Sequence, residues 1–166
     1  MEAVRLVKVS QQALAQSRSV LDIVAEAWQA QALAQAIGGH LAATGPPELR
    51  GEARGLSEAG GRGCAVLDRP GLRIGGIRAA QLSQVTDPAS VLTSLGGLLG
   101  DVAMALVSVA CATDEEGLYW QCMEAIDAAD ESSDRIRGML RRLALREQER
   151  QERSSEALRD STAGPS

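Results

Sequence analysis

The sequence contains very few aromatic residues. Phenylalanine and asparagine are absent, aromatics make up 2% of the 166 residues, and Lys8 is the only lysine. Any core must therefore be built from alanine, leucine, valine and isoleucine, with a few methionines. Such side chains suit close helix–helix contact better than a β-sandwich, which favours bulky and β-branched residues. The apolar fraction of 45% is enough for one globular domain at this length.

Cysteine and histidine are also scarce. Cys64, Cys111 and Cys122 are widely spaced and form no CxxC pair, so we expect neither a disulfide framework nor a zinc site, but reduced thiols in the cytoplasm. His40 is the only histidine, and no glutamate stands three residues before it. A nucleophile lacks an obvious base, and a di-metal bundle lacks its Glu-x-x-His pairs. We expect no enzymatic activity, no bound metal and no other cofactor.

The charge pattern gives no basic face. The formal net charge is −5, and the arginines alternate with carboxylates. A nucleic-acid-binding surface needs clustered positive charge and aromatic rings for stacking, so we expect no nucleic-acid partner. Four carboxylates share one face of a predicted helix and could hold a hard cation. We favour a solvated face instead, neutralised in part by Arg135 and Arg137; the four are Asp127, Asp130, Glu131 and Asp134.

Apolar residues in the first 43 positions recur in alternating steps of three and four. This spacing predicts one long helix over 3–43, in which Gln16 either sets the register of the seam or reaches past it to water. Ser19 followed by Asp22 is an alternative helix start after Arg18. The apolar row resumes in the same register at Val20, which favours a single helix; its apolar members are Leu6, Val9, Ala13, Val20, Ile23, Ala27, Ala30, Ala34, Ile37 and Leu41.

The rest of the chain divides at proline and glycine. Gly45-Pro46-Pro47 ends the first helix and opens a short one over 47–64. Residues 65–86 are predicted to be a loop with a short helical turn near 77–84. Asp87-Pro88 opens a third helix over 88–112. Thr113 and Glu116 form a capping-box pair for a fourth helix, which ends near residue 146.

These elements predict an all-α fold, an antiparallel four-helix bundle with long first and fourth helices. The bundle domain covers 1–146, and its flexible loop lies at about 65–86. Residues 147–166 are charged and polar, so we expect a disordered tail. The third helix is apolar almost all round, which predicts that it is the central, most buried helix.

The third helix is long and apolar enough to span a bilayer. Its only charge is Asp101, which lies on one narrow face with serines and Gly97. A central aspartate costs about 2.5–3.5 kcal/mol on insertion scales, so we expect a bundle helix rather than a membrane span. If Asp101 is buried it needs a partner, such as an arginine, Lys8 or His40. Asp101 and His40 are therefore candidates for a ligand or buried polar site.

Two further features point to partner surfaces. Tyr119 and Trp120 stand at the start of the fourth helix, and exposed rings of this kind often anchor interfaces; they could equally plug the end of the bundle. Trp28 is assigned to the core. Glycine pairs spaced by four, Gly51/Gly55 and Gly96/Gly100, permit close helix contact, either within the chain or across a homodimer seam. The shortage of bulky residues favours the dimer.

Two segments resemble a known family. Residues 22–31 read DIVAEAWQAQ and residues 45–54 read GPPELRGEAR. Both are similar to segments of a family of short, uncharacterised actinobacterial helical proteins, and the resemblance extends to about residue 145. The family implies a helical fold and no activity.

Two functional hypotheses follow. The first is a non-enzymatic helical interaction or scaffold protein, acting as a homodimer or with another protein. The second is a regulatory bundle that binds a small ligand or lipid beside Asp101 and the loop over 65–86.

Overall fold

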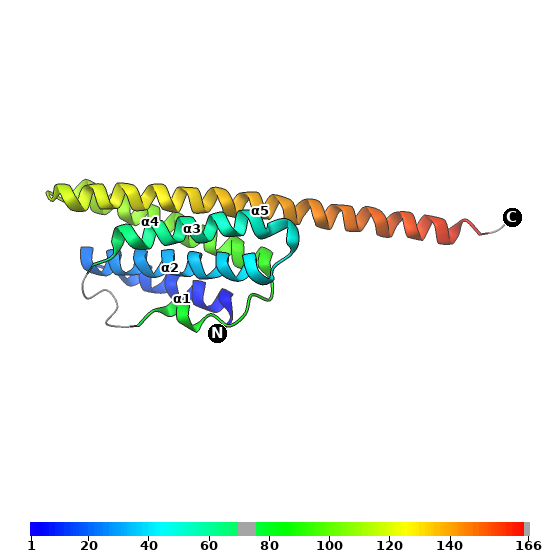
Figure 1. Cartoon of the computed structure of the whole chain (residues 1–166), viewed down its shortest axis with the longest axis horizontal. Coiled ribbons are helices and arrows are strands. Elements are labelled where there is room, and N and C mark those ends of the chain that lie inside the picture. Colours follow the sequence, from blue (N-terminus) through cyan, green and yellow to red (C-terminus); the bar gives the residue numbers. More distant parts are fainter. Residues whose placement is uncertain (70–75, 165–166) are drawn as a thin grey trace.

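The computed structural model describes residues 1–69 and 76–164, and this part of the chain forms five α-helices and two short 3-10 helices (Figure 1). The predicted all-α class is confirmed. The predicted count of four helices is wrong, because the first predicted helix is two helices. The elements are α1 (Ala3–Gln16), α2 (Val20–Thr44), η1 (Pro47–Leu49), α3 (Arg50–Leu67), η2 (Arg78–Gln81), α4 (Pro88–Ala112) and α5 (Glu116–Thr162).

The chain breaks between α1 and α2 because local hydrogen bonds close both helix ends. The Ser17 backbone N–H donates to Leu14, and the Ser17 hydroxyl donates to the Ala13 carbonyl at 2.8 Å. Ser19 then caps α2 by accepting from the Asp22 N–H at 3.1 Å. The apolar row that favoured one helix fails at the break, since Val9 and Val20 are exposed, as is Gln16.

Helices α2 and α3 form an antiparallel hairpin with very close backbones. A Cβ at Gly38 of α2 would lie 2.6 Å from the Ser57 nitrogen of α3, and a Cβ at Gly60 of α3 would lie 2.6 Å from the Gln35 nitrogen of α2. The glycine pairs singled out from the sequence make no such backbone contact. A Cβ at Gly51 or Gly100 would meet open space, one at Gly55 would lie 2.6 Å from the Arg135 side chain, and one at Gly96 would lie 3.6 Å from the Ile136 side chain. The tight contact therefore depends on glycines that the four-residue spacing did not reveal.

Helix α5 covers both α3 and α4 and then projects beyond the bundle (Figure 1). Ion pairs of Arg62 with Glu131 and of Glu48 with Arg146 join α3 and η1 to α5 in antiparallel order. Every described residue from Ala144 onward is exposed. We call residues 144–162 the arm.

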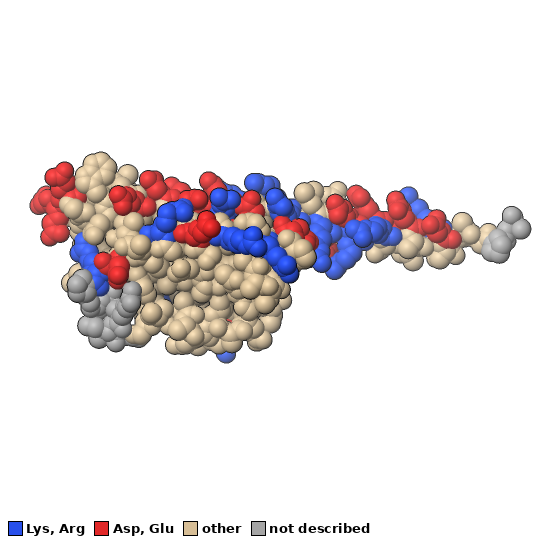
Figure 2. Space-filling model, in the orientation of Figure 1, with Lys and Arg blue, Asp and Glu red and all other residues tan. Residues whose placement is uncertain are grey.

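The prediction that residues 147–166 are disordered is wrong over 147–162, which continue α5. The segment consists mainly of good helix formers, and ion pairs one turn apart support it, including Glu147–Arg150 at 3.0 Å and Glu149–Arg153 at 3.8 Å. The high charge of this segment predicts disorder, but acidic and basic residues that lie one helical turn apart also stabilise a solvated helix. Figure 2 shows the charges gathered along α5 and the lower part of this face almost free of them.

The predicted loop over 65–86 contains helical structure in its described residues. Its residues 65–67 belong to α3, η2 confirms the predicted turn near 77–84, and the loop prediction over 70–75 lies outside the described residues. The end of this segment runs beside the start of α1, where the Ala3 N–H donates to the Gln84 carbonyl at 3.1 Å.

The core is rich in leucine. Leu33, Leu56, Leu95 and Leu106 are fully buried, as are many other apolar residues of all five α-helices in the described part. Trp28 is 4% exposed, in agreement with its assignment to the core. A single chain therefore buries a continuous core without a second copy.

Helix α4 is not the most buried helix, contrary to the sequence prediction. One side, with Leu95, Leu99 and Leu106, packs into the core, while Met104 on the opposite side is 74% exposed and Val107 is 46% exposed. Composition showed that α4 is apolar all round, but only the packing shows that its neighbours α1, α2 and α5 cover one side of it.

Candidate interaction surface

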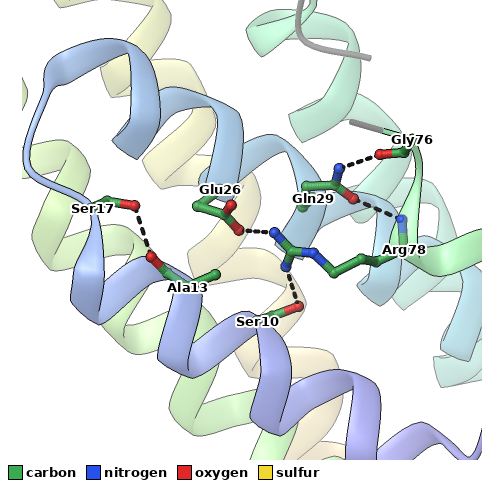
Figure 3. Close-up of polar contacts among 7 residues, drawn as sticks. All are labelled: Ser10, Ala13, Ser17, Glu26, Gln29, Gly76 and Arg78. Atoms are coloured by element: carbon green, nitrogen blue, oxygen red, sulfur yellow. Dashed lines mark hydrogen bonds and ion pairs between the residues drawn. The ribbon is translucent and has the colours of Figure 1, made fainter. Parts of the chain in front are cut away.

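The most connected polar cluster in the described residues is structural. Figure 3 shows the Arg78 guanidinium between α1 and α2, where it forms an ion pair with Glu26 and donates to the Ser10 hydroxyl at 2.9 Å. Gln29 donates to the Gly76 carbonyl at 2.7 Å and accepts from the Arg78 N–H at 3.0 Å. The Arg78 and Glu26 side chains are each 19% exposed.

This cluster attaches the segment that contains η2 to α1 and α2. A guanidinium donates hydrogen bonds and accepts none, so Arg78 cannot act as a base that removes the proton of the Ser10 hydroxyl. The cluster was not predicted from the sequence. No spacing rule could have paired Glu26 and Gln29 with Arg78, about 50 positions later in the chain.

Asp101 and His40 do not form the buried polar site that was considered. Asp101 is exposed, so the burial that would have required a partner does not occur. His40 is half-buried near the end of α2. The hydrogen bonds and ion pairs found in the described residues do not link these two side chains.

Arginines pair with two of the four carboxylates on the acidic face of α5. Glu131 pairs with Arg62 and lies 3.8 Å from Arg135, and Asp134 pairs with Arg137 at 2.6 Å. Within residues 1–69 and 76–164, no three histidine, cysteine, aspartate or glutamate side chains are grouped so that they could hold a metal ion. These contacts agree with the interpretation of this face as solvated.

Tyr119 and Trp120 lie at the start of α5, as placed from the sequence. Their rings meet edge to face with centroids 5.2 Å apart. Tyr119 is 39% exposed and Trp120 is 57% exposed. Both rings therefore reach solvent, and the predicted partner surface at this end stays a prediction.

Thr113 does not complete the predicted capping box at the start of α5, because its hydroxyl accepts from the Glu115 N–H rather than from the Glu116 N–H.

A hollow of about 450 Å³ lies between α2, α3 and the segment with η2. Trp28, Cys64 and Ala79 are among its lining residues. Asp68 and Ile77, which also line it, flank the range 70–75 outside the described residues, so we assign no ligand to it.

The outer side of α4 is the candidate interaction surface, because it is exposed and uncharged. Its residues are exposed and share one side of the helix, opposite the buried leucines. A soluble chain rarely leaves such an uncharged helix face open unless another surface covers it. We call this face the α4 strip; it comprises Thr93, Gly97, Gly100, Met104, Val107 and Cys111.

Two hydroxyl groups on this side of α4 already donate hydrogen bonds within the helix. The Thr93 hydroxyl donates to the Ala89 carbonyl at 2.8 Å, and the Ser108 hydroxyl donates to the Met104 carbonyl at 3.2 Å. Covering these groups would leave no new unpaired donor, so burial of the strip carries little polar cost. Asp101 stands at the edge of the strip, where its carboxylate can remain in water.

A groove of about 390 Å³ runs beside the strip between α4 and α5. Gly96 and Gly100 form its α4 wall, and Ile136 and Leu140 contribute apolar atoms from α5. Arg137 and Asp130 also line it. The groove exists because glycines on α4 leave space where side chains would otherwise stand, as shown by the open space beside Gly100.

Helix α4 also meets the length and composition criteria for a membrane span, with 39% of its most apolar window buried in the bundle. Those criteria are weak evidence here, since the core helix of a soluble protein meets them as well. The packing of α4 against α1, α2 and α5 is the arrangement of a bundle helix.

Together these features define a helical bundle with a covered core and one uncovered apolar helix face. The chain belongs to DUF6099, a family of unknown function, which matches residues 1–142. The resemblance to an uncharacterised family is thus confirmed, and the match ends where the arm is about to begin. No curated protein and no solved structure matches the chain.

Proposed function

We propose that this protein is a non-enzymatic helical interaction protein that binds another protein chain through the α4 strip. The observation that carries the proposal is the exposure of Met104 and Val107 on a helix whose only charge is Asp101. Water in contact with such a surface is released when a partner covers it, which favours association. The presence of a single histidine in the sequence supports a role without catalysis.

The hypothesis of a ligand site beside Asp101 receives less support. It depended on the polar edge at Asp101 and on the loop over 65–86, and the Asp101 side chain is exposed to solvent. The strip is a face rather than an enclosed cavity, and a face of this kind fits a protein partner better than a small molecule. We take α4 as a bundle helix of a cytoplasmic protein in this proposal.

Site-specific photocrosslinking in cells of the native host tests the proposal. A photoreactive amino acid replaces Met104 in one variant and Leu158 in the other. These residues are similarly exposed, at 74% and 66%, but Leu158 lies on the arm. We expect a discrete crosslinked protein from position 104, identified by mass spectrometry, and none of it from position 158. Crosslinks from position 104 only to lipid, or to no defined protein, would contradict the proposal.

A further inference from the structure

We infer that the α4 strip binds the same strip of a second copy, with the two α4 helices antiparallel and Met104 of each chain over Gly100 of the other. This inference rests on the proposed function and names the partner. The argument depends on the order of small and large residues along the strip, on the groove beside it and on its lack of charge.

Along the middle of the strip two glycines, Gly97 and Gly100, precede two larger residues, Met104 and Val107. Toward the start of α4, a Cβ at Gly100 would meet nothing within 4 Å, and one at Gly97 would meet only the Gln11 amide, at 3.6 Å. Toward the end of α4, Met104 and Val107 protrude into solvent. The middle of the strip therefore has two hollows followed by two knobs.

This order makes the strip complementary to itself. In a two-fold dimer the same patch serves both chains, so residue i faces residue j and j faces i. An antiparallel pair with its axis beside Val102 places Gly100 opposite Met104, Gly97 opposite Val107, and Thr93 opposite Cys111. Each hollow then faces a knob.

A parallel pair lacks this complementarity. It would place Met104 against Met104 and Gly100 against Gly100, so that two knobs collide and two hollows leave a void. Voids and overpacking each destabilise an interface as they destabilise a core. The size order of the strip thus favours one of the two helix directions.

The groove between α4 and α5 can accommodate the Met104 side chain of the second copy. Gly96 and Gly100 form one wall, and Ile136 and Leu140 of α5 add apolar atoms to a volume of about 390 Å³. Methionine is unbranched and flexible, so it can pack against the apolar wall of an irregular groove, while Asp130 and Arg137 line other parts of it. Met104 of the second copy reaches the groove beside Gly100 in the antiparallel arrangement.

A second copy explains the strip better than a bilayer does. A bilayer presents neither knobs nor hollows, so the size order along the strip would serve no purpose in it. A charged partner is not favoured either, because Asp101 at the edge is the only charge on α4. In the antiparallel pair the two Asp101 carboxylates lie on the same rim of the interface, close to the two-fold axis, where solvent and salt screen their repulsion.

Sedimentation velocity on the purified full chain tests the inference. We expect a concentration-dependent dimer for the natural sequence and at least a 30-fold weaker association for Met104→Asp. Leu158→Asp on the arm is the matched control and should leave the dimer unchanged. Circular dichroism and thermal melts establish that each variant is folded. A natural chain that stays monomeric at several hundred micromolar, or a dimer that survives Met104→Asp, overturns the inference.

Disulfide trapping tests the helix direction. In a Thr93→Cys chain that also carries Cys64→Ser, mild oxidation should join the introduced thiol to Cys111 of the other copy. Peptide mapping identifies the bond. Bonds that instead join Cys111 to Cys111 would indicate a parallel pair and overturn the antiparallel arrangement.

The two proposals can fail separately. If the purified chain is monomeric and position 104 crosslinks to a different protein in cells, the proposed function stands and self-association is wrong. If the purified chain instead co-sediments with phosphatidylglycerol vesicles and forms no dimer, both are wrong.

Discussion

Gly60 of α3 lies so close to Gln35 of α2 that a Cβ on Gly60 would be 2.6 Å from the Gln35 backbone nitrogen. It would also be 2.8 Å from the Gln31 carbonyl oxygen. Both atoms belong to the backbone of α2 and cannot rotate away. The absence of a side chain at position 60 therefore sets the distance between the two helices.

Gly60→Ala is expected to destabilise the protein, although alanine is the better helix former. Pushing α2 and α3 apart should lower the free energy of unfolding by about 1–3 kcal/mol, the usual range for overpacking. Gly51→Ala in the same helix is the control. Its Cβ meets open space, so helix propensity alone should raise stability by up to about 1 kcal/mol. Urea denaturation followed by circular dichroism measures both, and effects of the same sign would refute the close-contact argument.

Arg78→Met tests the attachment of the η2 segment. The substitution keeps the apolar stem but leaves the mostly buried Glu26 carboxylate without its ion pair, so we expect a loss of about 1–3 kcal/mol. Hydrogen exchange over residues 76–82 should become faster, because the segment is released from α1 and α2.

The control for that experiment is Arg153→Met on the arm. The Arg153–Glu149 pair is exposed on both sides, and such pairs contribute little. Its unfolding free energy should stay within about 0.5 kcal/mol of the natural value. Equal losses in the two variants would mean that Arg78 does not hold the segment.

Deletion of residues 147–166 should leave the bundle intact. The deletion keeps Arg146, whose pair with Glu48 at 3.0 Å joins α5 to η1. Every residue that it removes within the described range 147–164 is exposed. We expect an unchanged Tm and a loss of about one eighth of the helical signal at 222 nm, in proportion to the helical residues removed. A lower Tm would show that the arm packs on the bundle.

Cys122 predicts a dependence of stability on pH. Burial raises the pKa of its thiol above the ordinary value of 9.0, and the charge of Arg69 opposes that shift in part. Since the folded-state pKa lies above the unfolded one, the full stabilisation is present below about pH 9 and is lost as the pH rises through the folded pKa. Urea denaturation between pH 7 and 10.5 should show a steeper alkaline loss for the natural chain than for Cys122→Ala. Parallel curves would contradict this expectation.

Several elements could be predicted from the sequence because their signals are local. The Asp87 cap and Pro88 define the start of α4, and the predicted bounds of 88–112 match that helix. Gly45 and Pro47 similarly place the turn between α2 and α3. The break at Ser17 and Ser19 was available as an alternative, but the apolar row outweighed it. The local hydrogen bonds of Ser17 and Ser19 determine where the helix ends, and the continuity of the apolar row does not.

The candidate surface could be predicted only in part. Composition showed that α4 is apolar and carries only Asp101, and the exposure of Tyr119 and Trp120 agrees with their assigned position. Which side of an all-apolar helix is left uncovered depends on where α1, α2 and α5 pack, and no periodicity contains that information. The Arg78 cluster was missed for the same reason, because its members are brought together only by folding.

The sequence by itself determined that this chain is helical, since side-chain spacing and end caps act over a few residues. Tertiary structure alone decided which glycines carry a close backbone contact, which carboxylates find arginines, and that Met104 faces solvent rather than the core. The physical reason is range: helix formation depends on neighbours three and four positions away, whereas burial depends on surfaces that meet only when the whole chain has packed.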